Sequence, residues 1–591
     1  MMDLNVLYKS LVDEYSQNIS RVKKQLFWVA TIRLIMFASL VTSIYLWVHT
    51  GNFFWSMASL VFIAGFLYLV KQSAGLNAQK LLNEHLLSIN QNELNVLSGL
   101  PNQFYNGSME ESGDHYYTDL DIFGANSLYH LLNRASTKAG KARLTSLLKN
   151  SITDPQKIIQ FQHAIKALAR QQNARQHICA EALAIKDFDN AQPLLSWVAQ
   201  PGVIYKNAYL QKASYILPVI NFIALIASIY IGQYYLLSLS VLISWFHVGS
   251  IGKYVNAQYM QLGKKQEMLE AFAAILREWN KVDVKDALHL QQLQQQTLQA
   301  NIAIQKLSAL VNLLDQRLNI LVNILLNSFL LYDIHCITSL EKWKIANHNK
   351  LPIWIDCVGQ VESLVSLSTY AFNHPENMYP VLSEEKVCIE ASDLYHPLIP
   401  LQENVSNDVS IGIKNRILLI TGSNMSGKTT YLRTVGINTL MAQCGLPVCA
   451  AYFLFHPLQI YSSIRITDSL QEHTSYFMAE LKRLQQIITQ IQNGKPGLIL
   501  IDEILRGTNS DDKYHGSEEF VKKLVQHNTL TLFATHDLKL SELENEYPGV
   551  IKNYCFESII NKGELIFDYK ILPGVAKNRN ASFLMKKMGI I

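Results

Sequence analysis

Two long apolar runs near the start of the chain form its strongest hydrophobic pattern. The first extends from Leu26 to about Val48, the second from Phe53 to Val70, and His49-Thr-Gly-Asn52 separates them. Each run is close to the roughly 20 residues that a helix needs to cross a bilayer. Arg33 is the one charge inside the first run, early enough in it to reach the headgroups. The pattern predicts a transmembrane hairpin over residues 26–71, after a polar, helical lead over residues 1–25.

A second pair of apolar runs predicts another hairpin within residues 215–250. The runs are Tyr215–Ile231 and Tyr234–Gly249, joined by Gly232-Gln233. Pro218 and Asn221 weaken the third span, so a buried helical hairpin is the alternative. We therefore expect the chain to contact a lipid bilayer through four spans.

Basic residues flank both hairpins and are absent from their short turns. The flanking residues are Arg21, Lys23, Lys24, Lys71, Lys206, Lys212, Lys253, Lys264 and Lys265. Cytoplasmic flanks of membrane helices carry such an excess of Lys and Arg. The pattern places every long segment in the cytoplasm and the chain in the inner (cytoplasmic) membrane.

Two further stretches with helical periodicity lie after the second hairpin. Residues Leu288 to Leu310, rich in Gln, predict one long amphipathic helix. Leu318 to Leu331 is apolar but short for a span, and Asn319, Asn323 and Asn327 fall on one helical face. We interpret it as a buried lever helix near the C-terminal domain. Residues 72–117 are expected to form a linker.

A glycine-rich loop after a β-like run gives the clearest chemistry of the chain. The run Arg416 to Ile420 leads into Thr421-Gly-Ser-Asn-Met-Ser-Gly-Lys-Thr-Thr430, and a helix-like run continues to Cys444. This is the pattern of a phosphate-binding loop between a strand and a helix. Its backbone amides would surround phosphates, Lys428 would bind the outer phosphates, and Thr429 would bind Mg²⁺. The candidate nucleotide-binding residues are Gly422, Ser423, Asn424, Met425, Ser426, Gly427, Lys428, Thr429 and Thr430.

Two carboxylates follow a second buried strand. Leu498-Ile-Leu-Ile runs into Asp502 and Glu503, at the strand end where open α/β sheets bind ligands. Asp502 suits Mg²⁺, and Glu503 suits the polarisation of a water that attacks the γ-phosphate. His536 ends a third strand, Thr529 to Thr535, and is a candidate γ-phosphate sensor. Its alternative role is a hydrogen bond to a neighbouring loop. ATP and Mg²⁺ are thus the expected cofactors, and Lys428, Glu503 and His536 the expected catalytic residues.

The loop and several later motifs resemble the MutS mismatch-repair ATPases. The loop through Arg433, Ser475-Tyr-Phe-Met-Ala-Glu480, Asp502-Glu-Ile-Leu-Arg-Gly-Thr508, Ala534-Thr-His536 and Asp568-Tyr-Lys-Ile-Leu-Pro-Gly574 occur in the family's order. Asp121-Ile-Phe-Gly and Leu131-Leu-Asn-Arg134 resemble its helical core. The resemblance implies an α/β P-loop domain of the ABC/MutS type over residues 377–591. It also implies an all-α core and lever over residues 118–370, which contains the second hairpin.

The resemblance further implies a homodimer in which each subunit completes its partner's site. Ser475, together with Ser469, would face the partner's nucleotide, and Asn424 would lie near the γ-phosphate. Asn509, Asp511 and Asp512 would lie at the dimer seam. Ser475 also fits a capping residue for the helix after it, which is compatible with that role.

Two departures from the family pattern bear on function. The stretch 403–408 lacks the aromatic residue that often stacks on adenine in the family, which leaves base selectivity open. Tyr395 and His396, from the preceding segment, are the candidates to replace it. The family's mismatch-reading tripeptide, Phe-x-Glu, occurs nowhere in the chain. We therefore expect a membrane-anchored MutS-like protein without the N-terminal mismatch-reading domain.

Composition limits the cofactors and binding partners that the chain is expected to have. The seven cysteines are scattered without a Cys-x-x-Cys pair, which argues against zinc and for a reducing compartment. The formal net charge is +4, and no long Lys/Arg stripe is present, whereas a strong DNA clamp usually shows one. Two functions stay open: a membrane-anchored ATPase that acts on mismatched or branched DNA, and a mechanochemical ATPase that acts on a protein or membrane partner. An ABC transporter is disfavoured because no Leu-Ser-Gly-Gly signature occurs.

Overall fold

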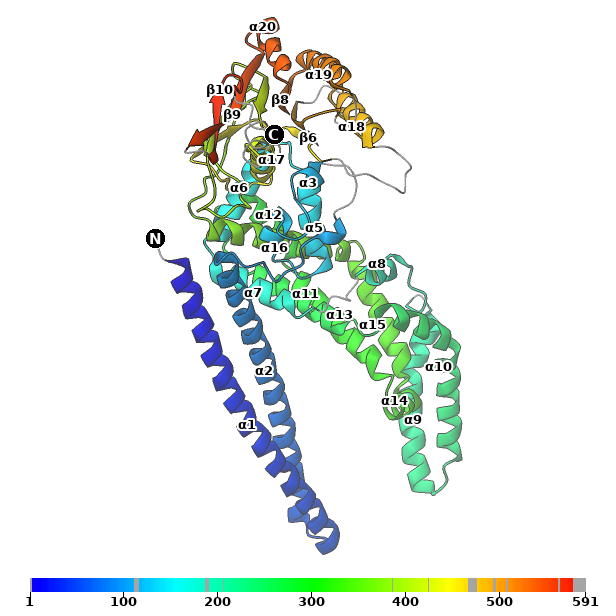
Figure 1. Cartoon of the computed structure of the whole chain (residues 1–591). Coiled ribbons are helices and arrows are strands. Elements are labelled where there is room, and N and C mark those ends of the chain that lie inside the picture. Colours follow the sequence, from blue (N-terminus) through cyan, green and yellow to red (C-terminus); the bar gives the residue numbers. More distant parts are fainter. Residues whose placement is uncertain are drawn as a thin grey trace.

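The computed structural model describes residues 3–110, 116–185, 191–205, 207–384, 386–423, 425–465, 476–492, 496–505, 509–561 and 564–577. Figure 1 shows an elongated molecule in which an α/β domain occupies one end and a helical region the middle. Two helical hairpins project from this middle region, away from the α/β domain.

The first hairpin consists of two very long helices, α1 (Leu4–Thr50) and α2 (Phe53–Leu97). Gly51 takes a left-handed conformation (φ 66°) at the turn, and the Asn52 side chain accepts a hydrogen bond from the Phe54 amide, which starts α2. The polar lead is helical as predicted, but it continues into the first apolar run without a break. The expected linker over residues 72–117 is wrong over most of its length, because α2 extends to Leu97.

The base of this hairpin is fastened to the helical core by buried polar contacts. Arg134 pairs with the Glu93 carboxylate at 2.5 Å, and both side chains are almost fully buried. Asn373 donates to the same carboxylate and accepts a hydrogen bond of 2.6 Å from the Tyr8 hydroxyl of α1. The Arg134 guanidinium and these hydrogen bonds hold the pKa of Glu93 below its usual value, against the opposing effect of burial. Both hairpin helices are thus tied to α16, which leads into the α/β domain.

The helical core and lever pack around the buried helix α16 (Leu351–Asn373). The remaining helices of this region are α3 (Tyr116–Asp119), α4 (Leu128–Leu132), α5 (Lys138–Lys149), α6 (Pro155–Ala169), α7 (Gln172–Leu183), α8 (Gln192–Ala199), α11 (Gln266–Trp279), α12 (Leu288–Thr297), α13 (Ala300–Gln316) and α15 (Tyr332–Asn347), with one 3₁₀ turn, η1 (Ser108–Glu110). The single long helix predicted over 288–310 is wrong, since the chain breaks between α12 and α13.

The second hairpin contains α9 (Ala208–Ile231) and α10 (Tyr235–Leu262), and α14 (Ile320–Leu330) packs beside both (Figure 1). The prediction that 318–331 is a buried lever helix near the C-terminal domain is wrong. Ile320 and Leu321 of α14 are each 72% exposed, and the helix lies on the hairpin, far from the α/β domain in Figure 1. Among the described residues, α1, α2, α9 and α10 are each long and apolar enough to cross a membrane.

The α/β domain is built on a six-stranded sheet in the order β10-β9-β4-β8-β7-β6. Its strands are parallel except β10, which pairs antiparallel with β9. Their bounds are β4 (Ile417–Gly422), β6 (Gln459–Ser463), β7 (Gly497–Asp502), β8 (Thr529–Thr535), β9 (Ile551–Asn561) and β10 (Glu564–Pro573). A second sheet, β1-β5-β2-β3, contains β1 (Val381–Leu382), β2 (Ile389–Leu394), β3 (Asn407–Ile411) and β5 (Tyr452–Phe455).

Helices cover both faces of the larger sheet. Leu418 and Ile420 of β4 face the core that contains α17 (Lys428–Gln443), whereas Ile417 and Leu419 face α18 (Tyr476–Ile491) and α19 (Ser510–Val525). The short elements η2 (Leu538–Glu542) and α20 (Leu543–Glu546) follow β8. The strands β4, β7 and β8 are therefore buried on both faces, as the continuous apolar runs of β4 and β7 predict. Their carboxyl ends meet at one edge of the sheet.

Candidate functional site: a nucleotide cavity at the sheet edge

The glycine-rich loop lies between β4 and α17, as predicted. Gly427 has φ 107°, a left-handed conformation that favours glycine. A Cβ atom on Gly422 would lie 2.8 Å from the Ser426 hydroxyl and 2.9 Å from the Phe556 carbonyl, so a larger residue does not fit there. Ser426 is buried, whereas Met425 is 85% exposed. The loop thus has the tight backbone path that phosphate binding requires.

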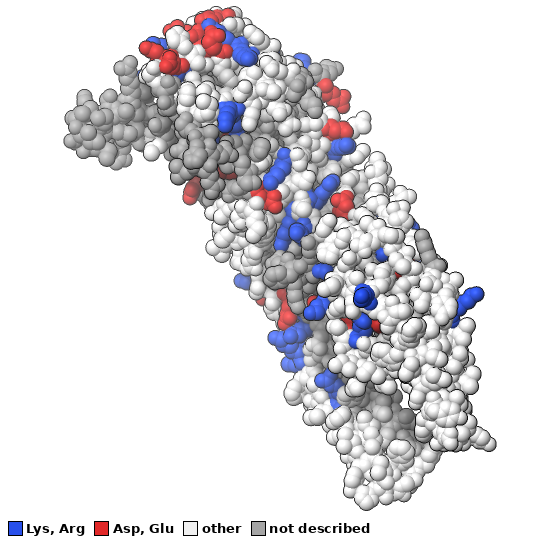
Figure 2. Space-filling model, turned by 90° about the vertical axis from the view of Figure 1, so that its right-hand side faces the viewer, with Lys and Arg blue, Asp and Glu red and all other residues white. Residues whose placement is uncertain are grey.

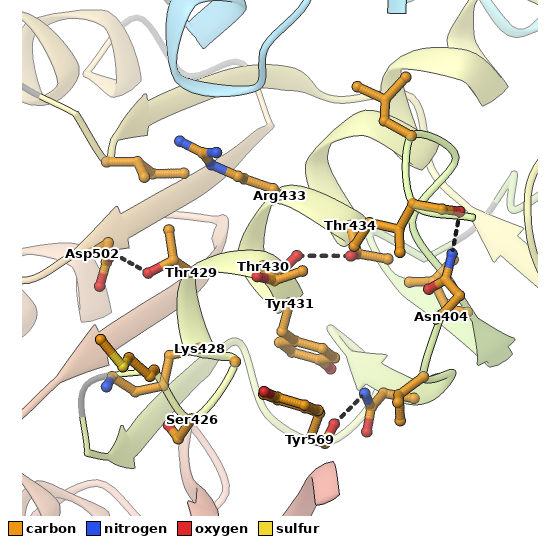
Figure 3. Close-up of a pocket in the computed structure, with 18 of the residues that line it drawn as sticks. Asn404, Ser426, Lys428, Thr429, Thr430, Tyr431, Arg433, Thr434, Asp502 and Tyr569 are labelled. Carbon is orange, nitrogen blue, oxygen red and sulfur yellow. Dashed lines mark hydrogen bonds between the residues drawn. The ribbon is translucent and has the colours of Figure 1, made fainter. Parts of the chain in front are cut away.

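The predicted cation and hydroxyl of this loop face the other strand ends. The buried Lys428 ammonium donates to the carbonyls of Gly422 and Ser423, each at 2.8 Å. The Thr429 hydroxyl donates to Asp502 at the end of β7, with an oxygen–oxygen distance of 2.5 Å (Figure 3). Residues 73 positions apart in the chain therefore come together.

The Thr429 and Asp502 oxygens fit a magnesium site. Mg²⁺ prefers oxygen ligands, and it usually combines one or two protein groups with waters and phosphates. The hydroxyl and the carboxylate lie side by side at the cavity, beside the loop that would hold the phosphates. In the part of the chain that the structure describes, no group of three or more His, Cys, Asp or Glu side chains could hold a metal ion.

Glu503 and His536 also line the cavity. The Glu503 carboxylate pairs with Lys513 of α19, and its backbone has φ 55°. The His536 Nε2 atom lies 3.5 Å from the Lys428 ammonium. Burial, and after it the Lys428 charge, lower the pKa of His536, so the imidazole is neutral at neutral pH. A neutral imidazole can donate one hydrogen bond to a phosphate oxygen.

The cavity has a volume of about 1060 Å³, and residues from both sheets and from the loop line it. Tyr569 is the aromatic side chain that opens onto it from β10, on the same side as Tyr431 of α17 (Figure 3). A register shift in the β9–β10 pairing between Phe567 and Ile571 produces a bulge there. Asn407 of β3 holds this bulge by bonding the Tyr569 carbonyl at 2.9 Å and the Ile571 amide at 2.8 Å. Bulges commonly re-aim a side chain next to a functional site.

The expectation that Tyr395 or His396 replaces the missing aromatic residue is wrong, because neither lines the cavity. The Tyr395 hydroxyl donates to Asn377 at 2.7 Å. His396 is buried, its Nδ1 accepts from the Leu398 amide, and burial lowers its pKa to about 4. Tyr569 lies in the quoted Asp568-Tyr-Lys motif, but nothing in the sequence showed that a bulge would point it into the cavity.

Acidic residues of the helical core reach the cavity wall, a link that the sequence did not predict. Asp121 pairs with Arg433 and with Arg465, both at 2.7 Å, and both arginines line the cavity. Asp119 accepts from the Arg465 amide at 2.8 Å and pairs with Arg483 of α18 at 3.0 Å. Nucleotide-facing side chains are therefore joined directly to the start of the helical core.

Several other predicted site residues either lie outside the described residues or lie at the start of α19. Asn424, Ser469 and Ser475 lie outside the described residues. Asn509 caps α19, since its side chain accepts from the Asp512 amide at 2.8 Å. Asp511 and Asp512 are exposed in the first turn of that helix. Their place at a dimer seam stays a prediction.

Taken together, the fold and the cavity define a P-loop nucleotide-binding domain of an α/β protein. Residues 418–587 match the family model described as MutS domain V. This C-terminal part of the chain is therefore similar to domain V of the MutS family.

Individual relatives match over the same part of the chain. "MutS protein homolog 4" of Homo sapiens is 33% identical over 196 residues, which are 32% of this chain and 21% of that protein. "DNA mismatch repair protein MutS" of Thermotoga maritima is 33% identical over 233 residues, 38% of this chain and 28% of the relative. "DNA mismatch repair protein MSH3" of Candida albicans is 34% identical over 250 residues, 39% of this chain and 23% of the relative. The chain thus matches between 21% and 28% of the length of these curated relatives.

Proposed function

We propose that the chain binds and hydrolyses ATP in the cavity at the sheet edge. The observation that carries this proposal is the contact between Thr429 and Asp502, because it joins the two motifs at one point. The loop amides and Lys428 bind the phosphates, and Tyr569 packs on the base. Glu503 orients and polarises the attacking water, and His536 donates to the γ-phosphate. Bound Mg²⁺ would be held by Thr429 and Asp502 and would neutralise phosphate charge.

The test is the substitution Glu503→Gln, which keeps the size of the side chain and removes its basicity. We expect ATP to bind with unchanged affinity while turnover falls by about 10²- to 10⁴-fold, the usual contribution of a general base. Glu519→Gln is the matched control, because that carboxylate is 76% exposed on α19. Normal turnover by the Glu503 variant would show that this carboxylate is not the base.

We also propose that the site works in a homodimer, with Ser475 of each subunit facing the partner's nucleotide. The family resemblance of the segment Ser475 to Glu480 supports this arrangement. Glu480 is buried and accepts from the Leu505 amide at 2.7 Å, so α18 is joined to the segment after Asp502 and Glu503. Mixing Ser475→Ala with Lys428→Ala subunits should restore part of the turnover. No restoration in mixed dimers would contradict the shared site.

We further propose that α1, α2, α9 and α10 anchor the chain in the inner (cytoplasmic) membrane, with the ATPase domain in the cytoplasm. Their length and apolar surface support this, and so does the absence of basic residues from both turns. On the face of the molecule that Figure 2 shows, Lys and Arg side chains lie on the middle and upper parts. The lower part of that face has no charged side chains. That distribution fits a bilayer around the lower part.

The proposed action of this membrane-anchored ATPase is on DNA of a mismatched or branched structure. The names of the matched relatives, which are DNA mismatch repair proteins, support this proposal. The alternative is a mechanochemical ATPase that acts on a protein or membrane partner. The buried contacts from Tyr8 and Glu93 to α16 favour the alternative, because they join the first hairpin to the core.

DNA binding by the detergent-solubilised full chain separates these two functions. Action on DNA predicts binding to branched or mismatched duplex with a steep loss of affinity as salt rises, since phosphate contacts release counterions. The comparison duplex is perfectly paired and of equal length. No binding at low salt with ATP present would exclude the first function and leave the second.

A further inference from the structure

The first turns of helix α14 expose large apolar side chains while its last turn buries small polar ones, which is the reverse of burial in a water-soluble domain. Ile320, Leu321, Ile324 and Leu325 form one stripe, and their exposed fractions are 72%, 72%, 47% and 59%. Asn327 and Ser328, by contrast, are buried. In water, an amphipathic helix packs its apolar stripe inward and exposes its polar face. The reversal indicates that the solvent around α14 is apolar.

The buried last turn of α14 is joined to the second hairpin by polar contacts. Asn221 of α9 donates to the Ser328 carbonyl at 2.9 Å and to Ser244 of α10 at 3.0 Å. Trp245 of α10 donates its indole N–H to the Ser328 hydroxyl at 3.0 Å. Asn221 lies near the middle of α9 (Ala208–Ile231). The end of α14 therefore packs against the central part of the hairpin.

Charged residues fix the chain on either side of α14. Arg317, which precedes the helix, pairs with Asp333 of α15 at 3.2 Å and donates to Asn256 of α10 at 2.8 Å. The helix itself turns by 103° from the preceding α12–α13 segment. Its 11 residues span about 16 Å, roughly half the hydrocarbon thickness of a bilayer. The segment is too short to cross, and it returns directly into α15.

We propose that α14 is embedded in the cytoplasmic leaflet beside α9 and α10, with its stripe of Ile320, Leu321, Ile324 and Leu325 against lipid acyl chains. The inference rests on the proposed insertion of the α9–α10 hairpin and goes beyond it. The helices α9 and α10, on which α14 packs, also expose apolar side chains, since Phe222, Ile226 and Phe246 are 51%, 67% and 75% exposed. The Phe222 ring lies 6.4 Å from the ring of Phe329 in α14, so the two apolar surfaces adjoin. The occupant is therefore lipid, because the surface is continuous with one that is long enough to span a membrane.

This position has a mechanical consequence for the lever. The helices α13 and α15 enter and leave α14 directly, so they would end at the membrane surface instead of in water. A movement of the lever would then act on the leaflet through α14 as well as through α9 and α10.

Lipid-accessible fluorescence on the full chain in vesicles tests the inference. Leu321→Cys and Ile324→Cys are labelled one at a time with an environment-sensitive fluorophore; the seven native cysteines are all buried. Phe246→Cys on α10 reports the hairpin, and Ile302→Cys, 68% exposed on α13, is the matched apolar site on the lever. Vesicle lipids brominated on their acyl chains quench labels in the bilayer, and aqueous iodide quenches labels in water.

We expect the two α14 labels to be quenched by brominated lipid and shielded from iodide, as at Phe246, with the opposite behaviour at Ile302. If the α14 labels follow Ile302 while Phe246 contacts lipid, the inference is wrong and the membrane anchor stands. If Phe246 is also accessible to iodide, both are wrong. Shielding of α14 from both quenchers would identify a protein contact instead of lipid.

Discussion

The α/β domain and the two hairpins place their apolar side chains in opposite positions. In the domain, every residue of β4, β7 and β8 is buried, and polar groups gather at the cavity. In the hairpins, large apolar residues such as Phe27, Leu34 and Ile226 are 66%, 69% and 67% exposed. Small polar residues there are buried, and the hydroxyls of Ser43 and Ser59 meet at 2.9 Å between α1 and α2.

A difference in the surrounding solvent would explain why the two regions bury different kinds of side chain. Water drives apolar groups inward in the domain. In hydrocarbon this force is absent between helices, so small and polar residues form the helix interfaces and apolar residues face outward. The difference therefore supports the proposal that the hairpins lie in lipid and the α/β domain in water.

A change at the cavity should act on nucleotide binding alone. Lys428→Ala removes the cation of the phosphate loop and should weaken ATP binding by about 100-fold or more, because hydrogen bonds to a charged group contribute about 1.5–3 kcal/mol each. Membrane association should not change. Lys414→Ala, at an exposed lysine of the same domain, is the control in a fluorescent-nucleotide titration. Equal ATP affinities of the two variants would show that Lys428 does not bind the nucleotide.

A charge on the hairpin should be costly although its site is exposed. Ile226→Arg places a guanidinium on the exposed side of α9 that we propose faces lipid, which should lower stability by about 3 kcal/mol. Ile302→Arg, at a site of almost equal exposure on α13, should change it by less than about 0.5 kcal/mol, as in water. Detergent-induced unfolding of the chain in lipid bicelles measures both. Equal, small effects would mean that α9 faces water.

Acid should destabilise the α/β domain through His396. Its pKa of about 4 in the folded chain lies below the usual 6.5, so below pH 6.5 the unfolded chain takes up a proton that the folded chain does not. The free energy of unfolding should fall by up to about 3 kcal/mol between pH 6.5 and 4 and then level off. Differential scanning calorimetry of the full chain across this pH range follows the unfolding.

The matched variant His396→Gln should show a shallower fall over the same pH range. An unchanged slope would show that other groups cause the acid sensitivity.

The smallest expected effect concerns the end of the cavity that would hold the adenine base. Tyr569→Ala should raise the dissociation constant of ATP by about tenfold, because stacking of a base on an aromatic ring contributes about 1–3 kcal/mol. Tyr395→Ala, which removes a tyrosine outside the cavity, should leave it unchanged. A larger effect of Tyr395→Ala than of Tyr569→Ala would instead support Tyr395 as the residue that stacks on adenine.

The strands and the motifs were predictable because each depends on local pattern. Continuous apolar runs marked β4 and β7, and spacing marked the loop with Lys428 and Thr429. Long-range packing was not predictable. Nothing in the sequence indicated that the Asn407 side chain would hold a bulge under Tyr569, or that Asp121 would reach Arg433.

The misassignment of α14 has a related cause. Of its three Asn residues only Asn327 is buried, and the sequence does not show which solvent surrounds a helix. We assumed that the apolar face points into protein, whereas Ile320 and Leu321 are its most exposed large residues.

Thiol labelling in intact cells tests most directly the claim that a cytoplasmic nucleotide domain is carried on membrane-inserted hairpins. Cysteines replace Asn52 and Gln233 at the two turns and Leu401, 61% exposed, on the α/β domain, each in a separate variant. A membrane-impermeant maleimide should label both turns from outside, and Leu401→Cys only after the cells are opened. Protection of the turns until lysis, together with release of the chain from membranes by alkaline carbonate, would contradict the claim.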